Sequence, residues 1–119
     1  MAQQEPQYVV TSVRSTSSGT VGRSLNAIRN HHVVIDSPTI GEAVTSGEAF
    51  LAGISSCGVN LIEGAARDEG VPLERLEVAI DGLRSPETPA NFARVDMRFR
   101  MVGVSQAQAE ELLQIYQER

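Results

Sequence analysis

The chain contains one cysteine, Cys57, which lies in the most apolar stretch of the sequence, and the carboxylate Glu48 precedes it in the same stretch. A thiol acts as a nucleophile or redox group when its surroundings favour the thiolate form. All ten basic residues are arginines, so Schiff-base chemistry, anchoring of pyridoxal phosphate and the lysine of a phosphate-binding loop are excluded. If the protein acts through a side-chain nucleophile, Cys57 is therefore the leading candidate.

A helix from Thr45 to about Gly70 is expected to position this thiol. Thr45 and Glu48 have the spacing of a capping box, in which each side chain bonds the other's backbone amide. Gly70 suits the left-handed closing position of a helix, and Pro72 follows it. One face of this helix carries apolar residues and the cysteine at helical spacing: Phe50, Ile54, Cys57 and Leu61.

The first four turns of this predicted helix are apolar on nearly every side, because Ala49, Leu51, Ala52, Val59 and Ile62 occupy the other faces. A helix of this kind needs cover all round, and one small sheet cannot supply it. A second subunit is the simplest cover, so the sequence predicts a homodimer with a large apolar interface.

The rest of the chain is expected to form strands and one further helix. Patterns of β-branched and alternating residues predict strands over residues 7–14, 20–28, 30–35, 76–83 and 92–102. A Ser/Thr/Gly-rich turn is expected at 15–19, a proline-containing hairpin loop at 85–90, and a helix from Ser105 to Glu118. The order βββ–α–ββ–α is that of an α+β fold, expected as a single domain over residues 1–119.

Composition and charge exclude several functions. A formal charge of −5 argues against a general nucleic-acid binder, and no apolar run reaches the length of a membrane span. One cysteine gives no disulfide framework and fits a reducing compartment, and no secretory signal is visible, so a soluble cytoplasmic protein is expected. Neighbouring residues on a strand point to opposite faces, so His31 and His32 cannot chelate one metal ion. No cofactor site is expected.

The segment from Glu48 to Cys57, Glu-Ala-Phe-Leu-Ala-Gly-Ile-Ser-Ser-Cys, resembles the central-helix signature of the OsmC/Ohr family. This family comprises the osmotically induced and organic hydroperoxide resistance proteins. The linker and strand start at 68–78, the strand at 92–102 and the final acidic helix continue the resemblance, which covers the chain from about Thr20 onward. The helix signature is its most specific part.

The resemblance implies an intertwined homodimer whose two active sites reduce organic hydroperoxides. Cys57 matches the peroxidatic cysteine, whose thiolate attacks the peroxide and becomes a sulfenic acid. An arginine from the N-terminal β region lowers the thiol pKa and polarises the peroxide in this family, and Arg23 and Arg29 are both candidates. Glu48 occupies approximately the place of the glutamate that orients this arginine.

The chain departs from the family pattern in one respect. The family has a second cysteine after the last helix, before a final strand, which resolves the sulfenic acid as a disulfide, whereas this sequence ends at Arg119. Three readings stay open: a truncated form, a protein that uses an external thiol, or a protein that has lost the peroxidase cycle. An external reductant would be a dithiol such as lipoamide or a small-molecule thiol.

Each candidate residue also has a structural interpretation. Cysteine is among the most buried residue types, and Cys57 shares its face with apolar side chains. The capping box alone explains Glu48, and single arginines are usually solvated or paired at the surface. The competing function is accordingly a catalytically silent dimer that binds a small apolar ligand at the subunit interface.

Overall fold

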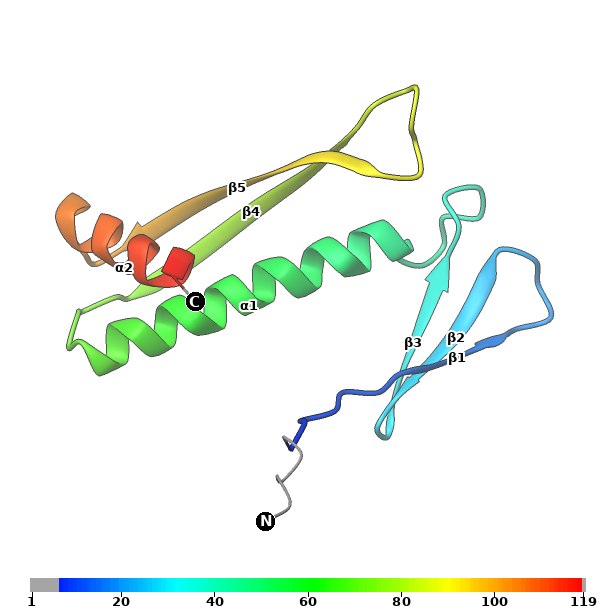
Figure 1. Cartoon of the computed structure of the whole chain (residues 1–119), viewed down its shortest axis with the longest axis horizontal. Helices are drawn as coiled ribbons and strands as arrows, with labels where there is room; N and C mark the ends of the chain where they lie inside the picture. Colours follow the sequence, from blue (N-terminus) through cyan, green and yellow to red (C-terminus); the bar gives the residue numbers. More distant parts are fainter. Residues whose placement is uncertain (1–6, 119) are drawn as a thin grey trace, which may run out of the picture. The chain divides into compact units, whose positions relative to one another are not determined.

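The computed structural model describes residues 7–118, and the chain forms two compact units that divide after Ser46. The first unit is a three-stranded antiparallel sheet, and the second is a helix–hairpin–helix unit (Figure 1). The predicted α+β class and the order βββ–α–ββ–α are confirmed. The assignment of the chain to a single domain stays a prediction.

The first sheet has the strand order β1-β2-β3, formed by β1 (Arg14–Ser17), β2 (Arg23–Ile28) and β3 (His31–Asp36). Pairing of Ile28 with His31 leaves Arg29 and Asn30 as a two-residue hairpin turn, and Arg29 has a φ of 56°. Such left-handed values are uncommon outside glycine, and they occur in tight hairpin turns.

The prediction for the first strand is wrong. Residues 7–13 form no strand, and Val9 is 99% exposed, whereas residues 15–17 of the expected turn belong to β1. Pairing rather than β propensity decides this position, because β1 lies opposite the middle of β2 and the Ser15 hydroxyl donates to Asn26 Oδ1 at 2.5 Å. The second strand also begins later than expected, at Arg23 instead of Thr20.

The three-stranded sheet has buried polar side chains and exposed apolar ones. Its buried residues are Asn26 and Asp36, and Asn26 Nδ2 donates to the Val33 carbonyl at 3.0 Å. Leu25 pairs with Val34 on the face opposite Asn26, which is also the face of the paired Arg23 and Asp36. Both apolar side chains are about two-fifths exposed, at 44% and 40%. This sheet therefore presents apolar surface that its own unit does not cover.

The second unit comprises α1 (Ser46–Asp68), β4 (Arg75–Arg84), β5 (Phe92–Val102) and α2 (Gln106–Glu118). β4 and β5 form an antiparallel hairpin, and α1 runs along one face of it (Figure 1). Glycine supplies the left-handed residue after α1, since Gly70 has a φ of 67°. These bounds agree with the sequence prediction to within two residues, and those of β5 agree fully.

The core of this unit gathers at the C-terminal half of α1. The buried apolar residues are Ile62, Ala65, Ala66 and Leu112, and side chains from β4, β5 and α2 pack around them, including Phe99 and Met101. Toward its N-terminus, α1 is much less covered, and Phe50 is 58% exposed. Half of the helix therefore has apolar faces for which its own unit supplies no cover.

By length and composition alone, α1 meets the criteria for a membrane-spanning helix, which differs from the sequence expectation that no segment is long enough. The core helices of soluble proteins meet the same criteria, so this single helix is weak evidence for a membrane protein.

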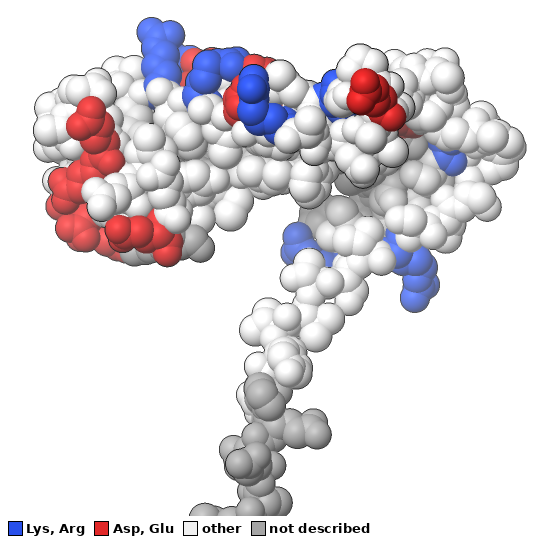
Figure 2. All heavy atoms as spheres, turned by 45° about the horizontal axis from the view of Figure 1, so that its top comes forward, with Lys and Arg blue, Asp and Glu red and all other residues white. Residues whose placement is uncertain are grey.

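Charged side chains cover the outer face of the β4–β5 hairpin (Figure 2). Arg98 pairs with Asp81 at 2.5 Å, and Arg94 pairs with Asp96 at 3.0 Å. These ion pairs lie on the solvent-exposed face of the hairpin. Acidic side chains gather at the α2 end of the unit, where Glu63, Asp68, Glu69, Glu74, Glu110 and Glu111 are exposed.

Candidate active site

Cys57 opens into an apolar groove on α1. The groove has a volume of about 480 Å³ and is lined by Ala49, Phe50, Gly53, Ile54, Cys57 and Tyr116. The helix face that the sequence predicts therefore forms the floor of the groove from Phe50 to Cys57. The thiol is exposed in this chain and lies outside the core cluster of its unit.

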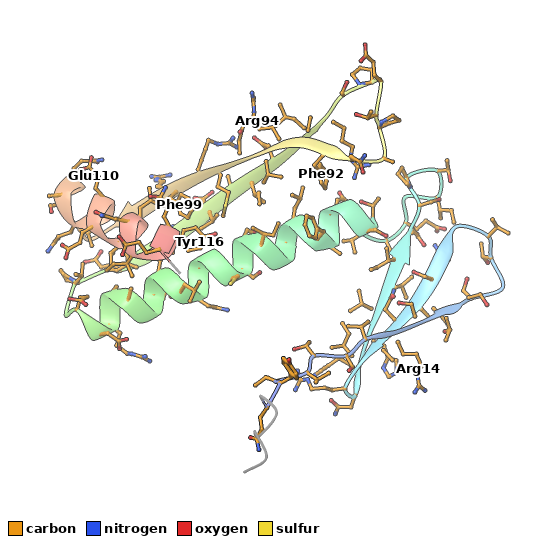
Figure 3. All side chains as sticks on the ribbon, viewed as in Figure 1. Arg14, Phe92, Arg94, Phe99, Glu110 and Tyr116 are labelled. Carbon is orange, nitrogen blue, oxygen red and sulfur yellow. The ribbon has the colours of Figure 1, made fainter. Side chains whose placement is uncertain are left out.

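Tyr116 is a lining residue that the sequence did not indicate as part of the site. Its hydroxyl contacts Met97 Sδ at 3.7 Å as a weak donor, and its ring lies 5.6 Å from that of Phe99 at 59° (Figure 3). Tilted aromatic pairs of this kind are favourable. The spacing of α2 predicts that Tyr116 faces inward, but only tertiary packing brings this ring to the groove.

An aromatic stack lies beside the other end of the groove. The rings of Phe50 and Phe92 lie 6.2 Å apart and nearly parallel, at 12°. The Arg84 guanidinium carbon lies 4.4 Å from the Phe92 ring centroid, within the range of a cation–π contact. Nothing in the sequence pattern of β4 distinguishes this arginine from a solvated residue at a strand end.

Arg23, one of the two candidate arginines, is held by two carboxylates. Its Nε bonds Asp36 Oδ1 at 2.7 Å, its Nη2 bonds Asp36 Oδ2 at 2.9 Å, and Nη2 also reaches Glu42 at 3.1 Å. The Asp36 side chain is fully buried and also accepts the backbone amides of Glu42 and Ala43. Asp36 therefore ties the loop after β3 to the Arg23 side chain.

The hydrogen bonds from Arg23 lower the pKa of Asp36 from 3.8 to about 2, helped by the backbone amide of Ala43 and opposed by burial. The same contacts raise the pKa of Arg23. A carboxyl group with a lowered folded-state pKa stabilises the fold above its unfolded-state pKa, and this contribution is lost as the pH falls through about 2.

We therefore expect Asp36→Asn to lower the melting temperature near neutral pH. The difference in melting temperature between this variant and the parent protein should narrow as the pH falls from about 4 toward 2. Thermal unfolding followed by circular dichroism across this range measures this difference. Asp68→Asn is the control, because that carboxylate is exposed and pairs with its neighbour Arg67. If Asp36→Asn lowers the melting temperature by the same amount at every pH, the lowered pKa of Asp36 does not contribute to stability as described.

Arg29, the other candidate arginine, is exposed at the β2–β3 turn. No carboxylate within residues 7–118 forms an ion pair with it. It lines a shallow hollow of about 410 Å³ together with Arg14, Ser12, Val13 and Ala27. The two candidate arginines thus differ: Arg23 is neutralised by its partners, and Arg29 is available to an external anion.

Glu48 and the two histidines complete the set of predicted residues. Glu48 is exposed in the first turn of α1. His31 and His32 are neighbours on β3, opposite Ile28 and Ala27. In the part of the chain that the structure describes, no group of three or more His, Cys, Asp or Glu side chains is placed to hold a metal ion.

Comparison with known proteins establishes the family. The model of the OsmC family, described as OsmC-like protein, matches residues 39–119, which include α1 and the whole groove. The chain belongs to this family. No curated protein matches the sequence.

Solved structures of OsmC-like proteins have the same fold at low sequence identity. An OsmC-like protein from Mycoplasma pneumoniae superposes with a TM-score of 0.83 at 11% identity, over 95% of this chain and 84% of that one. An organic hydroperoxide resistance protein OsmC from Legionella pneumophila gives 0.73 at 18%, over 95% and 85%. The organic hydroperoxide resistance protein OhrB of Bacillus subtilis gives 0.67 at 14%, over 92% and 84%.

Proposed function

We propose that this OsmC-family protein reduces organic hydroperoxides through Cys57. The observation that carries the proposal is the position of an exposed thiol on the floor of an open apolar groove, where a hydroperoxide with an apolar body can reach it. Family membership and two structural neighbours named as hydroperoxide resistance proteins support the same reaction.

In this reaction the Cys57 thiolate attacks the terminal oxygen of the hydroperoxide. A sulfur–oxygen bond forms, the oxygen–oxygen bond breaks, and the alkoxide takes a proton to leave as an alcohol. Cys57 is thereby oxidised to a sulfenic acid. A dithiol then restores the thiol: its first sulfur forms a mixed disulfide with Cys57 and releases water, and its second sulfur displaces Cys57 and becomes part of an oxidised disulfide.

For the arginine that assists this attack we favour Arg29 over Arg23. A cation lowers the pKa of a thiol and attracts a developing alkoxide only if its charge is not already neutralised. Arg23 is bound to Asp36 and Glu42, whereas Arg29 has no such partner among the described carboxylates. Glu48 is proposed to orient the assisting arginine, in addition to its place in the first turn of α1.

Turnover with tert-butyl hydroperoxide tests this proposal. With dihydrolipoamide or a small-molecule thiol as reductant, the protein is expected to consume many equivalents of peroxide per Cys57. Arg29→Gln should lower the rate more than Arg23→Gln once both variants are shown to be folded. Consumption that stops after one equivalent with every thiol donor contradicts catalytic turnover.

We also propose that the protein is a homodimer. Two apolar surfaces outside the groove support this: the exposed face of α1 around Ala52, and the sheet face around Leu25 and Val34. Burial of apolar surface of this kind drives subunit association.

Light scattering after gel filtration should give twice the chain mass of 12.8 kDa. Ala52→Glu places a charge on exposed apolar surface of α1 and should shift the protein to monomer, whereas Gln106→Glu on α2 should not. A mass of one chain at every concentration contradicts the dimer.

The apolar groove also supports a second function, which is the binding of a small apolar ligand without catalysis. The two functions differ in their dependence on sulfur. Thermal stabilisation by apolar ligands that is unchanged in Cys57→Ser, together with no peroxide consumption by the parent protein, favours the silent binder. We place either activity in the cytoplasm, because a single cysteine fits a reducing compartment. We expect no nucleic acid as a partner, because the net charge is −5, and no membrane.

A further inference from the structure

Tyr116 places a second polar group in the wall of the groove that carries the thiol. Of the six described residues that line this groove, only Cys57 and Tyr116 have a polar side-chain group. The other four are apolar side chains and a glycine: Ala49, Phe50, Gly53 and Ile54. A substrate that reaches the thiol therefore meets one hydroxyl among these side chains, and that hydroxyl belongs to α2.

The Tyr116 hydroxyl has a weak hydrogen-bond acceptor among the described residues. It donates to Met97 Sδ at 3.7 Å, and a thioether sulfur accepts hydrogen bonds only weakly. A negatively charged oxygen forms a shorter and stronger hydrogen bond with such a donor. The hydroxyl therefore loses little when it leaves the sulfur of Met97 for an oxygen atom that gains negative charge in the groove.

Packing holds the phenol ring against α1 next to the cysteine. A Cβ atom at Gly58, the residue after Cys57, would lie 3.5 Å from Tyr116 Cζ, which is the ring carbon that carries the hydroxyl. Gly58 is buried, and the Tyr116 ring lies 5.6 Å from the Phe99 ring at 59° (Figure 3). The ring is therefore fixed beside the turn of α1 that carries the thiol, and its position does not depend on its hydroxyl.

We propose that Tyr116 is a catalytic residue that donates the proton to the departing alkoxide when Cys57 reduces a hydroperoxide. The inference rests on the proposed function and adds a further group to the same reaction. A phenol is a stronger acid than an alcohol, so transfer of its proton to an alkoxide is favourable, and a positioned proton donor lowers the barrier to departure of the leaving group.

The proton and electrons balance in this step. The Cys57 thiolate bonds the terminal oxygen of the hydroperoxide, which keeps its hydrogen and becomes the hydroxyl of the sulfenic acid. The oxygen–oxygen bond breaks, and its electron pair stays on the other oxygen as an alkoxide. The alkoxide takes the phenol proton and leaves as an alcohol, and water then returns a proton to the Tyr116 oxygen.

Two oxidants with different leaving groups test this role. tert-Butyl hydroperoxide releases a strongly basic alkoxide that needs a proton, whereas peracetic acid releases acetate, a weak base that needs none. Tyr116→Phe keeps the ring and removes only the hydroxyl. In single-turnover oxidation of Cys57, this variant should react with tert-butyl hydroperoxide about a hundredfold more slowly than the parent protein, at the low end of what proton donors contribute. Its rate with peracetic acid should stay within about threefold of the parent rate.

Tyr8→Phe is the matched control, because Tyr8 is 81% exposed and lies in the other unit of the chain. This variant should keep the parent rate with both oxidants, and both variants should keep the parent melting temperature. A purely structural role for the hydroxyl predicts equal slowing with the two oxidants. Equal slowing overturns the inference, and so does a parent-like rate of Tyr116→Phe with tert-butyl hydroperoxide.

The parent protein separates failure of this inference from failure of the proposed function. If the parent protein reduces tert-butyl hydroperoxide through Cys57 and Tyr116→Phe gives either of the two overturning results, the proposed function stands without Tyr116 as its proton donor. If the parent protein does not reduce the peroxide at all, the proposed function and the role of Tyr116 are both contradicted.

Discussion

Replacement of Cys57 with serine is expected to reduce hydroperoxide consumption to the uncatalysed rate, a loss on the order of a thousandfold or more. The groove shape should persist, because a hydroxyl replaces a thiol at an exposed position. The reduction of peroxide should stop, since a serine hydroxyl is hardly ionised at neutral pH. Its oxygen also cannot be oxidised by the peroxide in the way that a thiolate sulfur is. The measurement is peroxide consumption with a dithiol reductant.

The matched control is Ser56→Ala, which changes the exposed neighbouring residue on the same helix and removes only a hydroxyl. This variant should retain the parent rate. Both variants should unfold at the same temperature as the parent protein. Peroxide consumption by Cys57→Ser at a rate close to that of the parent would place the chemistry elsewhere and contradict the proposed reaction.

Ile62→Ala is expected to have the largest effect on stability, about 2–5 kcal/mol. The Ile62 side chain is completely buried where α1, α2 and the β4–β5 hairpin meet, in contact with the cluster that contains Leu112. Removal of its methyl and methylene groups loses apolar burial and leaves a cavity that surrounding side chains fill only in part. Urea unfolding at fixed protein concentration gives the free energy.

Val21→Ala is the control for this measurement, because Val21 is 98% exposed and its truncation should change the free energy by less than about 0.5 kcal/mol. Similar losses in the two variants would mean that Ile62 is not the centre of the core. A loss in Ile62→Ala that grows at lower protein concentration would show that the same packing also supports the dimer.

The elements with strong local signals were predictable from the sequence. The alternation of apolar and polar residues predicts the bounds of β5, because the environment of its residues repeats with the period of a strand. The capping residues and Gly70 predict the two ends of α1. The first strand was not predictable, because Val9 and Val10 have high β propensity but no partner strand in their unit. The pairing of β1 with β2 overrode that propensity.

The site was predictable in part for the same physical reason. Helical spacing placed Phe50, Ile54 and Cys57 on one face, and these residues line the groove. Tyr116 and Arg84 come from other elements, and no local pattern reports that packing brings them to α1. The difference between the two candidate arginines likewise depends on which carboxylates fold against them.

The most direct measurement for the central claim is trapping of the oxidised sulfur. The protein is treated with tert-butyl hydroperoxide and dimedone, digested and analysed by mass spectrometry. We expect one dimedone adduct on the peptide that contains Cys57, and less adduct when Arg29 is replaced with glutamine. No adduct at Cys57, with the peroxide unconsumed, would contradict the claim that this thiol is the site of hydroperoxide reduction.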